Sequence, residues 1–185
     1  MPEIITTHDG SHSLYHPALQ ETYHSIHGAI RESQHVFINQ GLAYIKAGDI
    51  IQILEMGFGT GLNALLTLQH ARVHQIKIHY TTLEAFPVDK EIWQQLNYAD
   101  TLHCAADFAL LHEIPWDCVN AIDAYFHLHK MKLTLQAATL PHAVFNLVYY
   151  DAFAPSRQPE LWSLAVLQKV VDSMQPAGVF VTYCA

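Results

Sequence analysis

The sequence has few cysteines, few charges and no long apolar run, and each shortage excludes a class of protein. Its three cysteines, Cys104, Cys118 and Cys184, are too widely spaced for a disulfide framework or a zinc knuckle, which favours a reducing, cytoplasmic location. Only 14% of the residues are charged and 51% are hydrophobic, which is typical of a globular chain. No apolar run reaches the roughly 18 residues that span a bilayer, and the N-terminus lacks the pattern of a signal peptide, so we expect no membrane contact.

Basic residues are also scarce. Nine Lys and Arg stand against seventeen Asp and Glu, which gives a formal net charge of -8 and weighs against a nucleic-acid partner, because such proteins usually carry a basic footprint. The fourteen histidines are scattered along the chain. The pairs His24/His27 and His127/His129 are spaced closely enough to hold a metal ion, but no cysteine or acid joins them at ligand spacing. We therefore expect no metal site.

The most informative stretch runs from Ile50 to Asn63. It begins with β-branched and aliphatic residues, which predict a short buried strand, and then places glycines at 57, 59 and 61. A helical pattern follows, with Leu62, Leu65 and Leu66 on one face. A strand, a glycine turn and a helix open a nucleotide-binding βαβ unit, because glycine lets the backbone turn tightly and lets a ligand approach it.

The residues around these glycines indicate which ligand would bind. A dinucleotide fingerprint places its third glycine one position later, where this chain has Leu62, and a phosphate-binding P-loop would need a lysine that is absent. Here an acid, Glu55, closes the strand before the loop. A carboxylate suits a ligand with an ammonium and a sulfonium group, and this pattern is typical of enzymes that use S-adenosylmethionine (SAM). A glycine turn without a ligand and a dinucleotide site remain the alternatives.

Further short runs rich in β-branched and aromatic residues predict strands at 77–84, 132–135, 145–150 and 179–183. Helices are expected between them, at 89–96 with Asp89 as N-cap, within 97–130, and from Pro159 onward. The apolar face of the last helix is expected to comprise Leu164, Leu167, Val171 and Met174. Strands that alternate with helices predict a parallel α/β sheet of the Rossmann-like kind.

Acids follow the predicted strands at one edge of this sheet. Ligands of such sheets bind outside the carboxyl ends of the strands, and Glu55, Glu84 and Asp151 all occupy such ends. Glu84 stands where a carboxylate can accept both hydroxyl groups of a ribose. Ahead of the sheet, residues 3–15 predict a β-hairpin and 28–40 a helix, followed by a turn at 48–49. We therefore expect an N-terminal hairpin and helix appendage at 1–48 and a SAM-binding domain at 49–185.

Three segments together resemble one known family. Residues 55–63 read Glu-Met-Gly-Phe-Gly-Thr-Gly-Leu-Asn, residues 83–87 contain Leu-Glu and a proline, and residues 151–162 contain Asp-Ala-Phe-Ala-Pro and Gln-Pro-Glu-Leu-Trp. With Tyr23-His24-Ser25 near the front, they resemble the SAM-dependent methyltransferase domain of the MnmC type. The resemblance implies an N-methyltransferase that acts on the aminomethyl group of a modified wobble uridine in tRNA, with a separate oxidase partner.

The resemblance also implies roles for individual residues. Glu84 would hold the ribose of SAM, and Asp151 would orient the acceptor amine and accept its proton as the catalytic residue. The methionine part of SAM would be held by Glu55, Gly57, Phe58, Gly59, Thr60, Gly61 and Asn63. The acceptor would lie against Phe153, Pro155, Arg157 and Tyr183, with Tyr149 and Tyr150 adding to an aromatic wall on which the base could stack. Tyr149 or Tyr150 must face the core instead, because alternate strand residues point opposite ways.

The chain departs from the family pattern in two places. Family members carry Gly-Asp after the third strand, whose acid helps to hold adenine, and the aligned positions here are Ala138 and Thr139. The family also continues beyond the fifth strand with a helix and an antiparallel strand pair, so this pair is expected to be missing from the sheet. Two alternatives follow: a SAM methyltransferase for a small-molecule or protein amine, and a degenerate SAM-fold interaction module that binds no SAM.

Overall fold

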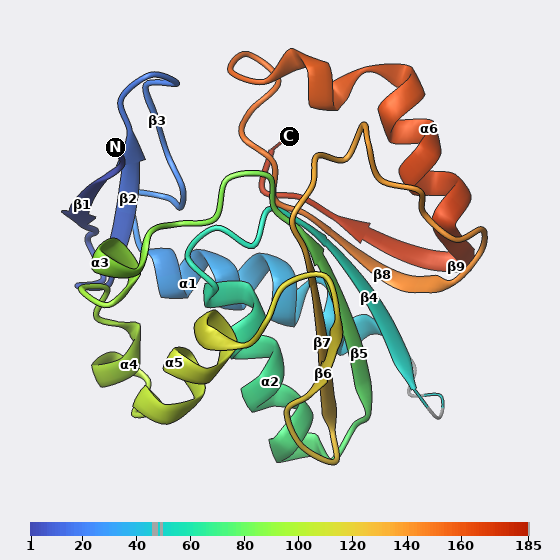
Figure 1. Ribbon diagram of the computed structural model, residues 1–185, viewed down its shortest axis with the longest axis horizontal. Coiled ribbons are helices and arrows are strands. Elements are labelled where there is room, and N and C mark those ends of the chain that lie inside the picture. The colour runs from blue at the N-terminus through green and yellow to red at the C-terminus, as the bar shows by residue number, and fades with distance from the viewer. Residues whose placement is uncertain (46–47, 49, 185) are drawn as a thin grey trace.

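A central sheet with the strand order β6-β7-β5-β4-β8-β9 organises the fold (Figure 1). The computed structural model describes residues 1–45, 48 and 50–184. The strands from β7 to β9 run parallel, whereas β6 pairs antiparallel to β7, which confirms the predicted Rossmann-like α/β class. The strands are β4 Ile51–Met56, β5 Ile78–Leu83, β6 Val119–Ala121, β7 Phe126–Met131, β8 Phe145–Tyr150 and β9 Met174–Val181.

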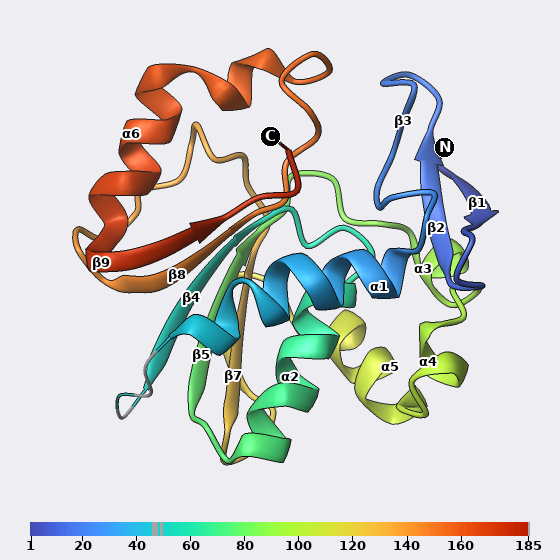
Figure 2. The same ribbon diagram turned by 180° about the vertical axis from the view of Figure 1, so that it is seen from behind.

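Helices cover both faces of this sheet. In Figures 1 and 2, α1, α2 and α5 lie against one face, while α6 lies over β8 and β9 on the other. Ile53 and Tyr149 are buried on the first face and Leu54 and Tyr150 on the second, as the alternation of strand side chains requires. The helices are α1 Ala29–Ser33, α2 Leu62–His74, α3 Lys90–Trp93, α4 Tyr98–Thr101, α5 Ala105–Glu113 and α6 Leu164–Ser173.

The N-terminal segment forms the predicted hairpin and helix. Strands β1 (Glu3–Thr6), β2 (His12–His16) and β3 (Glu21–Thr22) make a small antiparallel sheet, and α1 continues as a π-helical segment over Gln34–Asn39, with a 3-10 turn at Leu42–Tyr44. Leu14 and Phe37 of this segment are buried in the same core as β4. The turn predicted at 48–49 and the boundary placed there fall on Asp49, outside the described residues, so both stay predictions.

The third strand was predicted in the wrong place. It was expected at 132–135, but it is β7 at Phe126–Met131, inside a region expected to be helical. Phe126 and Leu128 alternate with the half-buried His127 and His129, a pattern of period two that is typical of a strand. Lys130 completes the alternation as a fully buried side chain, which hid the pattern in the sequence because lysine is almost never fully buried.

The last helix buries a different face from the one predicted. Val166 and Val170 are buried, whereas Leu164 and Val171 are 82% and 52% exposed. The helix also ends earlier, at Ser173, and β9 begins directly at Met174 rather than at Val179. Strand β9 lies at the edge of the described sheet and shifts its register against β8 between Met174 and Val179, so Pro176 stands in an irregular stretch of an edge strand, where proline is tolerated.

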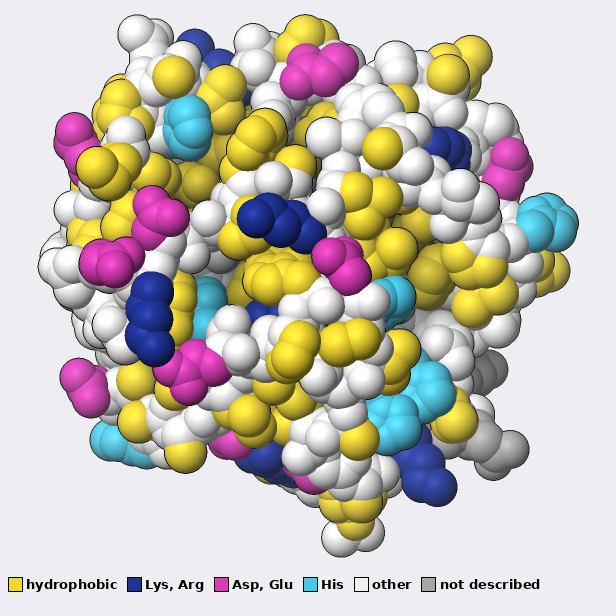
Figure 3. Space-filling model, in the orientation of Figure 1, with side chains coloured by type: hydrophobic (Ala, Val, Ile, Leu, Met, Phe, Trp, Pro, Cys, Tyr) yellow, Lys and Arg dark blue, Asp and Glu magenta, His cyan; other side chains and the backbone are white. Residues whose placement is uncertain are grey.

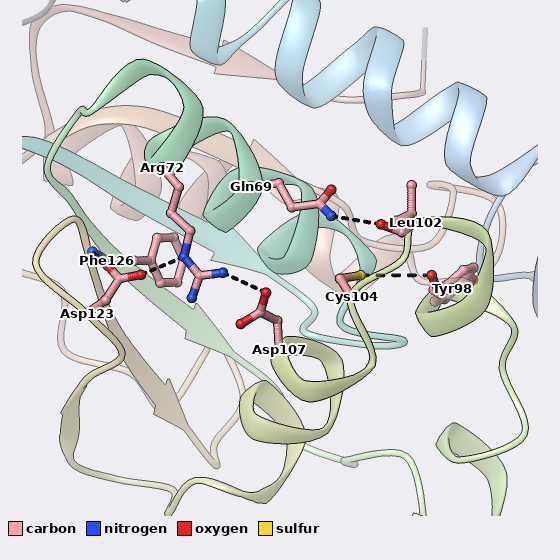
Figure 4. A network of polar contacts seen from close by, with 8 residues as sticks. All are labelled: Gln69, Arg72, Tyr98, Leu102, Cys104, Asp107, Asp123 and Phe126. Carbon is pink, nitrogen blue, oxygen red and sulfur yellow. Dashed lines mark hydrogen bonds and ion pairs between the residues drawn. The ribbon is translucent and has the colours of Figure 1, made fainter.

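Polar contacts tie the helices of the first face together. Arg72 of α2 forms ion pairs of 2.6 Å with Asp107 of α5 and with Asp123 between β6 and β7 (Figure 4). Asp89 precedes α3 as predicted, but its side chain makes no capping hydrogen bond. No helix in the part of the chain that the structure describes is long and apolar enough to cross a membrane.

Candidate functional site

A cavity of about 600 Å³ opens at the carboxyl ends of β4, β5 and β8. This is where ligands bind in open parallel sheets, because the loops that follow the strands converge there. The cavity brings together most of the residues that the sequence analysis selected: Gly57, Phe58, Gly59, Thr60, Asn63, Glu84, Asp151, Phe153 and Tyr183. They come from the loops after three strands, from the start of α2 and from the residues that follow β9.

Four of the selected residues are not among the described residues that line this cavity: Glu55, Gly61, Pro155 and Arg157. Glu55 lies within β4 and is buried, and Gly61 is the N-cap of α2. Arg157 is exposed and its Nε lies 3.5 Å from the carboxylate of Glu21, at the end of the small N-terminal sheet. Pro155 is exposed in the loop after β8.

The loop from Gly57 to Gly61 has the backbone that glycine permits. Gly57, Gly59 and Gly61 have φ values of 86°, 51° and 75°, a region that residues with a side chain rarely adopt. A Cβ on Gly61 would also lie 2.8 Å from Nε2 of His112, and one on Gly59 would lie 3.3 Å from the ring of Tyr23. Glycine is therefore needed at these positions for two reasons: the backbone has a positive φ, and the neighbouring side chains leave little room for a Cβ.

Glu84 follows β5 directly and supports this loop. Its Oε2 accepts a hydrogen bond of 3.0 Å from the Gly59 amide, and its Oε1 accepts one of 2.8 Å from the Phe86 amide. Burial raises the pKa of the Glu84 carboxyl, and these backbone hydrogen bonds oppose the shift because they favour the charged form. Phe86 is 82% exposed and lines the same cavity, so it offers an apolar surface beside the carboxylate.

Glu55 lies beneath the loop rather than in the cavity. It is 1% exposed, and neither carboxyl oxygen has a hydrogen-bond partner within the described residues. Burial raises its pKa to about 8. A carboxyl with this pKa is protonated at neutral pH, which relieves the large penalty of a buried charge.

Asp151 follows β8 directly and lines the cavity beside Gly57, since β8 is the neighbour of β4 in the sheet. The side-chain amide of Asn63 donates a hydrogen bond of 2.7 Å to its Oδ2, which fixes the carboxyl against the start of α2. Burial raises the pKa of Asp151 to about 7, and the charge of Glu32 adds to the shift. A group with this pKa can release or take up a proton near neutral pH, as a general base must.

The aromatic wall is smaller than predicted. Tyr149 and Tyr150 are both fully buried on opposite faces of the sheet, so neither can stack on a ligand in the cavity. Phe153 and Tyr183 do line the cavity, and Phe153 meets the ring of Tyr23 edge to face at 5.2 Å between centroids.

Sequence reasoning missed several cavity residues. His16, Leu19, Tyr23 and His24 come from the N-terminal segment, and the loop Leu133–Gln136 after β7 forms another wall. The string Tyr23-His24-Ser25 offered a signal through the family resemblance, but the wall at 133–136 had none once the third strand was misplaced. Ala138 and Thr139, aligned with the adenine-binding pair, are not among the described lining residues.

The histidines of the two pairs make other contacts. No group of three or more His, Cys, Asp or Glu side chains at metal-binding distance occurs among the residues that the structure describes. His24 is buried against the glycine loop, whereas His27 is exposed beside His8. His127 stacks on His79 of the neighbouring strand at 4.8 Å.

Comparisons with known proteins agree with the fold. A family model described as "S-adenosyl-L-methionine-dependent methyltransferase" matches residues 109–185. The chain is 30% identical over 92% of its length to the tRNA 5-methylaminomethyl-2-thiouridine biosynthesis bifunctional protein MnmC of Cupriavidus necator, and 32% identical over 80% of its length to that of Magnetococcus marinus. It spans only 28% and 24% of these relatives.

A solved structure is similar over nearly the whole chain. The crystal structure of MnmC2 from Aquifex aeolicus superposes with a TM-score of 0.76 and 27% sequence identity, and the match covers 99% of this chain and 60% of that one. The sheet, the cavity at its carboxyl edge and these matches define a SAM-dependent methyltransferase domain. Within that class, the relatives and the solved structure that the chain resembles are MnmC proteins.

Proposed function

We propose that this chain transfers a methyl group from SAM to the aminomethyl nitrogen of a modified wobble uridine in tRNA. The names of the relatives supply the substrate class. The observation that carries the proposal is Asp151, held by Asn63 at 2.7 Å with a pKa raised to about 7, in the same cavity as the glycine loop and next to it. A general base beside a cofactor loop is what the methylation of an amine requires.

The charge of the cavity fits SAM. Glu84, Asp151 and Glu160 are among its lining residues, and no Lys or Arg is found among those that the structure describes. Such a surface favours a ligand with an ammonium and a sulfonium group and disfavours the pyrophosphate of a dinucleotide. Asn63 and the backbone of Gly57–Thr60 would hold the methionine part, and Glu84 the ribose.

Bound SAM supplies a methyl group on a positively charged sulfur. An aminomethyl nitrogen has a solution pKa of about 9–10, as lysine does, and must lose its proton before it can attack. Asp151 would orient this amine and accept the proton, directly or through water. Phe153 and Tyr183 would contact the base, while Pro155 and Arg157, in the loop that follows Asp151, would meet the parts of the acceptor outside the cavity.

The partner surface is sparsely charged. Lys130 is fully buried and cannot meet a phosphate, which leaves Arg157 and the exposed Lys132 near the cavity. Figure 3 shows Lys and Arg side chains that lie apart on this face rather than in a continuous patch. The proposal therefore places most of the recognition at the base, with few phosphate contacts. It also implies a separate oxidase partner and a cytoplasmic location, where tRNA is found.

Titration calorimetry with SAM tests the cofactor site. We expect the wild-type chain to bind SAM with a micromolar Kd, and Glu84→Ala to lose this binding because Glu84 supports the loop and lines the cavity. Glu113→Ala is the matched control, since Glu113 is an exposed acid that pairs with Lys90 outside the cavity. Absence of SAM binding to the wild-type chain would contradict the proposal and support the degenerate interaction module.

Methyl transfer to tRNA then tests the acceptor. We expect incorporation of labelled methyl groups into tRNA that carries an aminomethyl uridine, and none into tRNA that lacks this modification. The net charge of -8 favours one competing function, a methyltransferase for a small-molecule or protein amine. Tight SAM binding without any tRNA affinity at low salt would overturn the tRNA proposal and support this competitor.

A further inference from the structure

Thr60, between Gly59 and Gly61 in the glycine loop, contacts two histidines from separate parts of the chain. Nε2 of His24, from the N-terminal segment, lies 2.7 Å from the Thr60 hydroxyl. Nε2 of His112, in the last turn of α5, lies 3.1 Å from the Thr60 carbonyl oxygen. Because a carbonyl only accepts, His112 donates this hydrogen bond. The side chain and the backbone of one loop residue are thus held separately.

His24 is rigidly mounted. It is 6% exposed, and its backbone amide donates a hydrogen bond of 3.0 Å to the Ser13 hydroxyl in β2. Burial lowers the pKa of its ring to about 4, so the ring is neutral at physiological pH and keeps one nitrogen as donor and one as acceptor. The hydrogen bond to Thr60 therefore joins the N-terminal sheet to the glycine loop, across 36 residues of sequence.

His112 is also held in place, by aromatic rings around its side chain and by a hydrogen bond to its backbone. Its ring stacks on Trp93 at 4.4 Å between centroids with an angle of 11°, and Phe58 and Phe108 meet it edge to face. The buried ammonium of Lys130 donates to the His112 carbonyl oxygen at 2.8 Å, which fixes the end of α5. Burial lowers the pKa of the His112 ring to about 3, so it too is neutral.

The loop needs such support. Glycine has many backbone conformations open to it, and the three glycines of this loop are held at positive φ. A loop that is flexible before binding loses conformational entropy when a ligand orders it. Within the loop, the Gly61 amide donates a hydrogen bond of 2.8 Å to the Phe58 carbonyl oxygen. Hydrogen exchange of the Gly61 amide therefore measures how often this turn opens. Anchors on both sides of Thr60 order the turn before any ligand arrives.

We propose that His24 and His112 are positioning residues that hold Thr60, and with it the glycine loop, in the shape that receives the cofactor. The proposal rests on the proposed function for its ligand, but the clamp itself exists in the ligand-free chain. The N-terminal segment is then a working part of the cofactor site rather than an appendage, since one of the two anchors comes from it.

Hydrogen exchange in the ligand-free protein tests the clamp without SAM. We expect His24→Leu, which keeps volume but removes the hydrogen bond, to speed exchange of the Gly61 amide by about 5-fold or more, since one such bond is worth roughly 1 kcal/mol. His24→Gln, whose amide reaches the same point, should stay within about 2-fold of wild type. Amides of α2 beyond Leu65 serve as internal references.

Thr60→Val distinguishes loss of the His24–Thr60 hydrogen bond from a general loss of folding, because it removes only the hydroxyl and leaves both histidines in place. It should speed Gly61 exchange as His24→Leu does, and the double variant should be no faster than either single one. His112→Leu and His112→Gln repeat the pair on the carbonyl side. Unchanged Gly61 exchange in Thr60→Val, or additive effects in the double variant, would overturn the clamp.

SAM titration of the same variants links the clamp to the cofactor. We expect the leucine variants to raise the Kd for SAM about 5-fold or more and the glutamine variants to rescue it, with His74→Leu, an exposed histidine at the end of α2, as control. Faster exchange with an unchanged Kd would overturn the positioning role. If the wild-type chain binds no SAM, the proposed function fails, while the exchange data alone still decide whether the clamp holds the loop.

Discussion

Asp151 has a fixed position and a pKa near neutrality, and both should affect the methylation rate. Its carboxyl must be ionised to accept a proton, so the methylation rate should fall as the pH drops below about 7. Asp151→Asn should lower kcat by roughly 100-fold while the Kd for SAM changes little, because the amide keeps the contact with Asn63 but cannot take up a proton.

Pre-steady-state methyl transfer between pH 5.5 and 9 measures this effect. The acid limb near pH 7 should vanish in Asp151→Asn, whereas Glu160→Gln, at the exposed mouth of the cavity, should retain it. Wild-type turnover in Asp151→Asn would remove Asp151 from the chemistry.

Glu55 should make stability depend on pH. Its folded pKa of about 8 lies above the ordinary value of 4.5, so its contribution is fully present below pH 4.5 and is lost as the pH rises through 8. Glu55→Gln cannot ionise and should gain up to a few kcal/mol over wild type at pH 9, with little difference at pH 5.

Urea unfolding at pH 5, 7 and 9 checks this expectation, with Glu113→Gln as an exposed control. An equal shift of the Glu55→Gln midpoint at all three pH values would show that Glu55 does not titrate with folding.

Of the three acids that the sequence placed at strand ends, Glu84 and Asp151 line the cavity, whereas Glu55 is buried beneath it. Glu84 and Asp151 could be located because a residue that follows a parallel strand must lie at the ligand edge. Tyr23 and His24 reach the cavity only through the packing of the N-terminal sheet, which no local pattern encodes. The burial of Tyr149 and Tyr150 likewise depends on which helices cover each face.

At the scale of elements, α6 supports a wall of the cavity through Lys169. Its ammonium donates to the carbonyl oxygens of Leu135, Gln136 and Ala138 at 3.2, 2.8 and 2.8 Å. Lys169→Met should leave these carbonyls without this donor, lower the free energy of unfolding by about 1–3 kcal/mol and weaken SAM binding.

Thermal unfolding and SAM titration of Lys169→Met and Lys169→Arg measure both effects, and arginine should restore part of the loss because it keeps donors at this position. If the methionine variant loses stability but binds SAM as wild type does, the wall at 135–138 has no part in the cofactor site.

Strands that are uninterrupted apolar runs were predicted well, whereas elements whose pattern is broken by a lysine, a proline or apolar residues on several sides were not. Strands β4, β5 and β8 are short apolar runs with defined ends, and they were found within a residue or two. Strand β7 was missed because Lys130 interrupts its apolar side, and the start of β9 because Pro176 reads as a stop. The face of α6 was misjudged because apolar residues occur on more than one side, and only the sheet selects Val166 and Val170.

For the whole molecule, the net charge of -8 predicts an unusual salt response. If Arg157 and Lys132 make the main phosphate contacts, the logarithm of the tRNA affinity should fall with the logarithm of the salt concentration with a slope of about -2. Filter binding between 50 and 200 mM salt measures the slope, and Arg157→Gln should reduce it by about one. A much steeper slope would mean that other cations make the phosphate contacts.

The buried ammonium of Lys130 has a consequence for studying the molecule as a whole. It is fully buried, with hydrogen bonds of 2.8 Å to the Leu111 and His112 carbonyl oxygens and with the ring of Trp116 4.6 Å away. An amine-reactive reagent can reach it only when α5 separates from β7. The rate of labelling at Lys130 therefore measures how often the native protein opens, and Lys130 reports how often the structure beneath the glycine loop separates.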